Sequence, residues 1–159
     1  MFVAVDFDGV VVDMHAHPYE DTKSKPALMP YAKEGLISLK KAGHVLLLYS
    51  ARANLSLRKD PNLDPLVQAG IRKPPRDLKK SQELSEARYQ QMLDFVNEEL
   101  PGIFDAIDDG MQGKPNVDLV IDDRALRYGS GVLSANWRVI SNMYGEPVYG
   151  ADDGKQKGK

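Results

Sequence analysis

Two apolar runs and one periodic segment dominate the first third of the chain. Residues 2–5 and 44–49 are almost wholly apolar, whereas in 31–42 the apolar positions recur at helical spacing. Uninterrupted apolar runs are typical of strands buried on both faces of a parallel sheet, and helical spacing is typical of a helix with one buried face. Gly43 follows the periodic segment, as glycine does at many helix ends. We therefore predict two parallel, neighbouring strands joined by a helix in a right-handed crossover.

The rest of the chain carries weaker versions of the same alternation. Prolines interrupt two polar segments, and helical spacing returns in a third before Pro101-Gly102 ends it. These patterns predict, in chain order, a loop over 13–30, an irregular insertion over 54–80 with one short helix at 64–69, a helix over 81–100, and short strands over 103–107, 117–121 and 137–140. Strands that alternate with helices predict the α/β class with a mostly parallel, doubly wound sheet.

Length, charge and cysteine content narrow the class of protein. At 159 residues we expect one domain over 1–150, followed by a disordered tail over 151–159 that is rich in Gly and Lys. A formal net charge of −2 disfavours a general nucleic-acid binder, and the lack of cysteine excludes disulfides, thiolate metal sites and thiol nucleophiles. No stretch has the pattern of a signal peptide or the length of a membrane span, so we expect a cytoplasmic protein without a membrane partner.

Acidic residues follow two of the predicted strands. Asp6 and Asp8 come directly after the first apolar run, and strand alternation would place their side chains on the same face of the backbone. Gly9 allows a sharp turn there and leaves room for a ligand near the backbone. Asp122 and Asp123 follow the strand over 117–121. If the two strands are parallel and adjacent, four carboxylates converge at one edge of the sheet, where a divalent cation, Mg²⁺ above all, would neutralise them.

A hydroxyl and an ammonium group are expected near the same edge. Ser50 ends the strand over 44–49, and Lys114 precedes the strand that leads to Asp122. Lys73 is the alternative to Lys114, since it also lies between Ser50 and Asp122. A cation, a carboxylate nucleophile, a hydroxyl and an ammonium together suit phosphoryl transfer, which depends on positioning and on neutralising the phosphoryl oxygens.

The order of these groups resembles the four motifs of the haloacid dehalogenase superfamily of phosphohydrolases. Asp6-Phe7-Asp8-Gly9-Val10 matches the first motif, D-x-D-G-[VT], and Ser50 the second. Lys114 in Gly113-Lys114-Pro115 is the best match to the third, and Asp122-Asp123 matches the fourth. The resemblance covers residues 2–124 and is greatest to compact members without a large cap. It implies a three-layer, Rossmann-like fold.

The resemblance implies a two-step hydrolysis of a phosphomonoester. Asp6 would attack phosphorus and form an aspartyl-phosphate, and Asp8 would protonate the leaving alcohol and then deprotonate the attacking water. Mg²⁺ would be held by Asp6, the backbone carbonyl of Asp8 and Asp122, with Asp123 acting through water or as an orienting group. Ser50 would hydrogen-bond a phosphoryl oxygen and Lys114 would neutralise the nucleophile and the phosphate.

Substrate contacts are predicted around the motifs and in the insertion. His15-Ala16-His17 also has the H-x-H form of a metal site, but hydrolases built on that pattern need more histidines and only His44 remains. The insertion over 54–80 carries seven basic residues and is either a lid for a polyanionic substrate or a solvated loop. The candidates for substrate contact are Gly9, His15, His17, Arg52, Arg72 and Lys73.

The sequence therefore predicts a Mg²⁺-dependent hydrolase of small phosphomonoesters. A nucleotide or polynucleotide-end phosphatase is the alternative within the same chemistry. A phosphoacceptor signalling module is an alternative of another class, although receiver domains carry their acidic pair at the end of the first strand. A catalytically silent relative that binds metal or phosphate is a third, although every proposed catalytic position is occupied.

Overall fold

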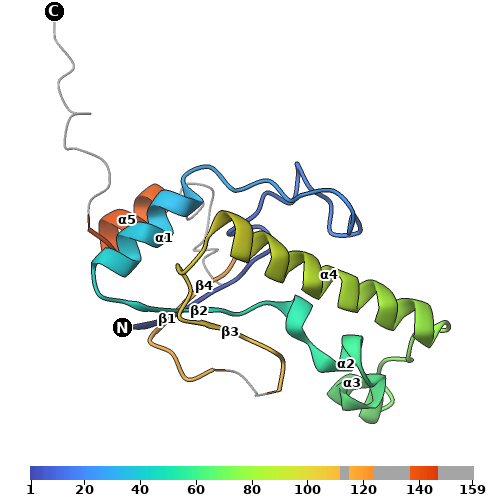
Figure 1. The fold of residues 1–159 in the computed structure, drawn as a ribbon. Coiled ribbons are helices and arrows are strands. Elements are labelled where there is room, and N and C mark those ends of the chain that lie inside the picture. Colours follow the sequence, from blue (N-terminus) through green and yellow to red (C-terminus); the bar gives the residue numbers. More distant parts are fainter. Residues whose placement is uncertain (112–114, 124–136, 147–159) are drawn as a thin grey trace, which may run out of the picture.

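Parallel strands form the central sheet of the protein (Figure 1). The structure is a computed structural model that describes residues 1–111, 115–123 and 137–146. Within these residues four strands pair in the order β3-β2-β1-β4, and every pair is parallel. The strands are β1 (Phe2–Val5), β2 (Val45–Leu48), β3 (Ala106–Ile107) and β4 (Leu119–Ile121).

The order of the strands creates a switch point beside β1. The chain moves outward from β1 to β2 and β3, and then returns to the opposite side of β1 with β4. Val5 is in register with Ile121, and the next amide, that of Asp6, donates to the Ile121 carbonyl at 2.9 Å. Open α/β sheets bind ligands at the carboxyl ends of strands where the order reverses. The carboxyl ends of β1 and β4 are therefore the expected place for a site.

Helices flank this sheet. Figure 1 shows α1 beside α5, and the short helices α2 and α3 near the N-terminal end of the long helix α4. Gly35 permits the close packing of α1 on α5, because a Cβ atom there would lie 2.5 Å from the Trp137 ring. The helices are α1 (Ala32–Lys41), α2 (Leu55–Arg58), α3 (Pro65–Gln68), α4 (Leu78–Glu99) and α5 (Trp137–Tyr144), with 3₁₀ turns at Ala51–Ala53 and Pro61–Leu63.

Burial explains why the first strand has no polar alternation. Val3, Ala4 and Val5 are all fully buried although neighbouring strand residues point to opposite faces, so both faces of β1 are covered. Phe7 is buried as well, and its ring meets the edge of Phe95 on α4 with centroids 5.7 Å apart. Phe7, which lies between Asp6 and Asp8 in the chain, is therefore part of the core.

The α/β class, the parallel sheet and most predicted elements are confirmed, and one element is wrong. The strand predicted over 137–140 is the helix α5. Trp137, Ile140 and Ser141 are buried at helical spacing, but the four mostly apolar residues 137–140 are too short a window to distinguish the two periods. The Trp137 indole N–H also donates to the Val10 carbonyl at 2.8 Å, a contact between residues far apart in the chain.

The insertion over 54–80 is more helical than predicted. Besides α3, which corresponds to the helix predicted at 64–69, it contains α2 and a 3₁₀ turn, and α4 already begins at Leu78. Asp77 starts α4 early because its side chain accepts from the Lys80 amide at 3.0 Å. The tail over 151–159 lies outside the described residues. No helix in the described part of the chain has the length and apolarity that crossing a membrane requires.

Candidate functional site

Three carboxylates meet at the switch point of the sheet. Asp6 follows β1, and Asp122 and Asp123 follow β4, the strand paired directly with β1. One side-chain oxygen from each of the three lies within 4.8 Å of the others. The predicted convergence of the two strand ends is therefore present, and it places three carboxyl groups around one point.

The surroundings of Asp6 make its negative charge costly. Burial is the largest cause that raises the pKa of Asp6, to about 7, and the charges of Asp122, Asp8 and Asp123 act in the same direction. A hydrogen bond of 2.7 Å from the Phe7 amide to Asp6 Oδ1 opposes them. A cation bound between these oxygens would remove the repulsion, and hard divalent ions such as Mg²⁺ prefer carboxylate oxygens. The residues present therefore fit a magnesium ion.

Gly9 gives the acidic group the space that it needs. Its φ of +78° lies in the left-handed region, which favours glycine, and a Cβ atom there would lie 3.2 Å from Asp123 Oδ2. The close neighbour of the Gly9 backbone is thus an acidic side chain of the protein. Its predicted contact with substrate stays a prediction.

Asp8 is held apart from this cluster by Arg52. The guanidinium donates to both carboxylate oxygens, from Nε to Oδ2 at 2.8 Å and from Nη2 to Oδ1 at 2.7 Å. The Arg52 side chain is 0 % exposed and that of Asp8 is 16 % exposed. Strand alternation does not extend to Asp8, because β1 ends at Val5 and the chain then turns. The Asp8 side chain is absent from the cluster of described carboxylates, and a contribution from its backbone carbonyl stays a prediction.

The Arg52 side chain is buried and makes its hydrogen bonds to protein groups. Its Nη1 donates to Gln91 Oε1 at 2.9 Å and to the Arg88 carbonyl at 3.0 Å, and its Cζ lies 4.9 Å from the Phe7 ring centroid. The side chain of Arg52, a candidate for substrate contact, is buried and bound to protein groups, and its contact with substrate stays a prediction. Gln91 and Arg88 were not identified from the sequence, because no local pattern relates α4 to a residue that follows β2.

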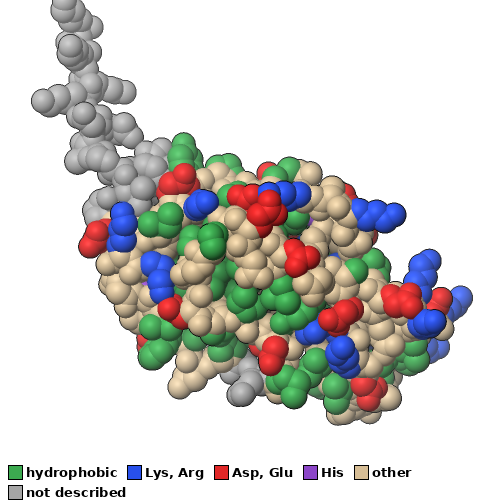
Figure 2. Space-filling model, viewed as in Figure 1, with side chains coloured by type: hydrophobic (Ala, Val, Ile, Leu, Met, Phe, Trp, Pro, Cys, Tyr) green, Lys and Arg blue, Asp and Glu red, His purple; other side chains and the backbone are tan. Residues whose placement is uncertain are grey.

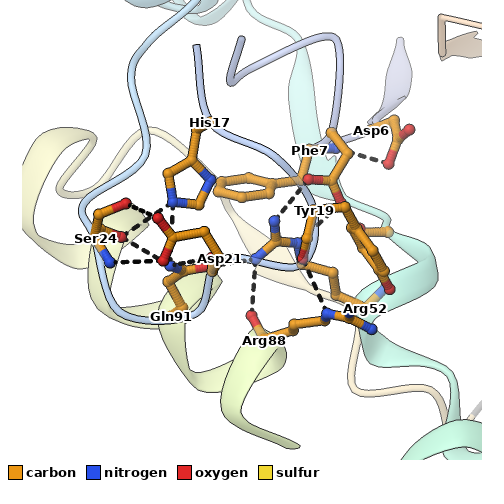
Figure 3. Close-up of polar contacts among 11 residues, drawn as sticks. Asp6, Phe7, His17, Tyr19, Asp21, Ser24, Arg52, Arg88 and Gln91 are labelled. Carbon is orange, nitrogen blue, oxygen red and sulfur yellow. Dashed lines mark hydrogen bonds and ion pairs between the residues drawn. The ribbon is translucent and has the colours of Figure 1, made fainter. Parts of the chain in front are cut away.

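The loop over 13–30 is fastened to α4 beside Arg52. Figure 3 shows His17, Asp21 and Ser24 gathered around Gln91. His17 is buried, and its Nε2 lies 3.1 Å from the Ser24 carbonyl, while its Nδ1 has no hydrogen-bond partner among the described residues. His15 is exposed. Neither histidine belongs to the one metal-type cluster among the described residues.

The remaining predicted site residues lie outside the acidic cluster or outside the described residues. Ser50 is buried after β2, where its Oγ accepts from the Arg52 amide at 3.3 Å. Arg72 donates to Asp64 at 2.9 Å, and both Arg72 and Lys73 line a groove formed by the insertion and the start of α4. None of the clustered aspartates lines that groove. Lys114 lies outside the described residues, so the choice between Lys114 and Lys73 stays open.

Comparison with known proteins gives no family for this chain. No protein-family model, no curated protein and no solved structure matches it.

Proposed function

We propose that the protein is a Mg²⁺-dependent phosphomonoester hydrolase of the haloacid dehalogenase type, with Asp6 as its nucleophile. The observation that carries the proposal is the meeting of Asp6, Asp122 and Asp123 at the switch point between β1 and β4. The four motifs in the chain order of that superfamily support it. We also propose that the helices cover both faces of the sheet in three layers, as the superfamily implies.

The reaction proceeds through two proton transfers and one covalent intermediate. A carboxylate oxygen of Asp6 forms a bond to phosphorus as the bond to the ester oxygen breaks, and Asp8 gives that oxygen its proton. Asp8 then takes a proton from the water that attacks the aspartyl-phosphate, which releases inorganic phosphate and restores both carboxyl groups. Asp6, Asp122 and Asp123 would hold Mg²⁺, which would supply positive charge to neutralise the phosphoryl oxygens. Ser50 and Lys114 bind the phosphoryl group in this scheme.

Phosphate release from a panel of phosphomonoesters tests the proposal. We expect the wild-type protein to hydrolyse p-nitrophenyl phosphate or a sugar phosphate with Mg²⁺ and to stop when EDTA is added. Asp122→Asn should lower the rate about tenfold or more and raise the Mg²⁺ concentration needed for half-maximal rate. Asp94→Asn, which changes an exposed carboxylate on α4, is the matched control and should leave both unchanged.

Two results would contradict the proposal. One is phosphate release that continues in EDTA and is insensitive to Asp122→Asn. The other is uptake of phosphate from acetyl phosphate without later release, which would identify a phosphoacceptor module.

A nucleotide or polynucleotide end is a second candidate substrate, favoured by the charge of the insertion. Figure 2 shows Lys and Arg side chains gathered over the region of α3 and the start of α4. Lys73, Arg76 and Lys80 are exposed there and make no ion pair with any described residue. Exposed unpaired cations attract polyanions at low salt. The insertion begins after Ser50, near the carboxyl end of β2. The acidic cluster lies at the same edge of the sheet, because β1, β2 and β4 are parallel.

Reversing two of these charges tests the second candidate. Arg76→Glu with Lys80→Glu should raise the KM for a 5′-phosphorylated oligonucleotide about tenfold at low salt and leave the KM for p-nitrophenyl phosphate unchanged. Lys33→Glu with Lys41→Glu makes the same charge change on exposed positions of α1 and is the control. Equal KM values for the oligonucleotide in all three proteins would eliminate the basic insertion as a substrate-binding element.

A further inference from the structure

A line of polar contacts that passes through the buried Arg52 connects α4 and the loop over 13–30 to Asp8. We propose that Gln91 is a positioning residue which, through Arg52, holds the Asp8 carboxylate in place for its proton transfers. This inference rests on the proposed function, and it assigns to Gln91 and Arg52 roles that act through Asp8. Figure 3 shows Gln91 between Arg52 and the part of the loop that contains Asp21 and Ser24.

The hydrogen bonds of Gln91 allow one orientation of its amide. Its Nε2 donates to the Ser24 carbonyl at 2.8 Å and to the Asp21 carbonyl at 3.0 Å. Backbone carbonyls only accept, so the NH₂ end of the amide must face the loop. The oxygen is then left for Arg52, whose Nη1 donates to it at 2.9 Å. A glutamate at this position could not donate to the two carbonyls.

The orientation of Gln91 in turn fixes the guanidinium. Arg52 is a planar fork, and its Nη1 is held by Gln91 and by the Arg88 carbonyl at 3.0 Å. Nε and Nη2 consequently face Asp8, which they bind in a bidentate pair. The chain of contacts therefore determines the plane of the Asp8 carboxylate as well as its place.

Charge explains why the partner on α4 is neutral. Arg52 is fully buried, and Asp8 is its one ion-pair partner among the described residues. A buried charge is retained only when it is paired, so the neutral Gln91 leaves the positive charge of Arg52 to Asp8 alone. A carboxylate at position 91 would compete with Asp8 for the same guanidinium. Gln91→Glu is therefore a nearly isosteric way of drawing Arg52 away from Asp8.

Displacing Asp8 should slow its proton transfers, and two substrates with different leaving groups distinguish which transfer is affected. Displacement of an acid–base group by about an ångström slows a reaction strongly because its hydrogen bonds to the reacting atoms must be aligned. p-Nitrophenolate leaves without a proton, whereas an alkoxide must be protonated. For p-nitrophenyl phosphate the defect should thus appear only when water attacks the aspartyl-phosphate. For an alkyl phosphate it should appear in both steps.

The experiment compares wild type, Gln91→Glu, Arg52→Lys and the control Gln90→Glu with p-nitrophenyl phosphate and glycerol 2-phosphate at saturating Mg²⁺. Gln90 is the exposed neighbour on the same helix, so its variant carries the same charge change. In Gln91→Glu we expect kcat/KM for glycerol 2-phosphate to fall about tenfold or more. For p-nitrophenyl phosphate kcat/KM should stay within about twofold while kcat falls, with a pre-steady-state burst of p-nitrophenolate. Arg52→Lys should show the same signature, and Gln90→Glu should behave as wild type.

Each outcome decides the inference. Equal loss of kcat/KM for both substrates in a Gln91→Glu protein that melts like wild type would overturn the positioning role and leave the proposed function standing. Wild-type kinetics in Gln91→Glu would overturn it as well. No hydrolysis of either ester by the wild-type protein would overturn the proposed function and the inference together. If Gln91→Glu does not fold, Gln91→Met, which removes the bonds to the loop and to Arg52 without adding charge, replaces it with the same expected signature.

Discussion

Replacing Asp6 with Asn should abolish phosphate release, with kcat lowered on the order of a thousandfold or more. The amide has nearly the same shape as the carboxylate but is a poor nucleophile, so no aspartyl-phosphate can form. The measurement is release of inorganic phosphate at saturating Mg²⁺, together with trapping of phosphorylated protein by acid quench. Wild-type protein should yield acid-stable labelled protein that Asp6→Asn lacks.

Stability separates loss of the nucleophile from loss of the fold. Without a divalent cation at pH 8, Asp6→Asn should be more stable than wild type, because the variant no longer buries a charge beside Asp122 and Asp123. The difference between the ordinary pKa of 3.8 and about 7 corresponds to roughly 4 kcal/mol, which is an upper limit for the gain. Asp94→Asn again serves as the control for activity. Substantial activity in Asp6→Asn would eliminate Asp6 as the nucleophile.

Mg²⁺ should stabilise the protein far more at pH 8 than at pH 5. The pKa of Asp6 is raised in the folded state, so between pH 3.8 and about 7 the folded protein keeps a proton that the unfolded chain has lost. The contribution of Asp6 to the free energy of unfolding is therefore complete below pH 3.8 and is lost as the pH rises through about 7. Above that pH Asp6 carries its negative charge beside Asp122 and Asp123, and it is also ready to bind a cation.

Urea unfolding at the two pH values measures this effect. At a Mg²⁺ concentration of about 100 times the dissociation constant, the free energy of unfolding at pH 8 should rise by about 2.7 kcal/mol. At pH 5 the same concentration should have a much smaller effect, because Mg²⁺ must displace the proton on Asp6. Asp122→Asn should weaken the response at pH 8, and NaCl of equal ionic strength is the control for screening. A response to Mg²⁺ of the same size at both pH values would contradict the raised pKa of Asp6.

Local pattern was sufficient for the framework of the site. The apolar runs that became β1, β2 and β4 are short and nearly continuous, a pattern that is typical of buried parallel strands. Parallel strands end at a common edge, so the positions of Asp6 and Asp122 in the chain imply their proximity in space. The acidic cluster was predictable for this reason, before any side-chain contact was known.

The partners of the acid–base residue could not be obtained in the same way. Asp8 is bound by Arg52, 44 positions further along the chain, and Arg52 is oriented by Gln91 on a different element. Periodicity describes which face of an element is buried, but it does not say which polar groups meet across elements. The α5 helix was missed for a different reason, because residues 137–140 are too short a window to distinguish the helical from the strand period. The amino-acid sequence alone therefore determined the strands and the carboxylates at their ends, because both depend on neighbours in the chain. Only the tertiary structure decided where Asp8 points, because that depends on buried groups brought together by folding.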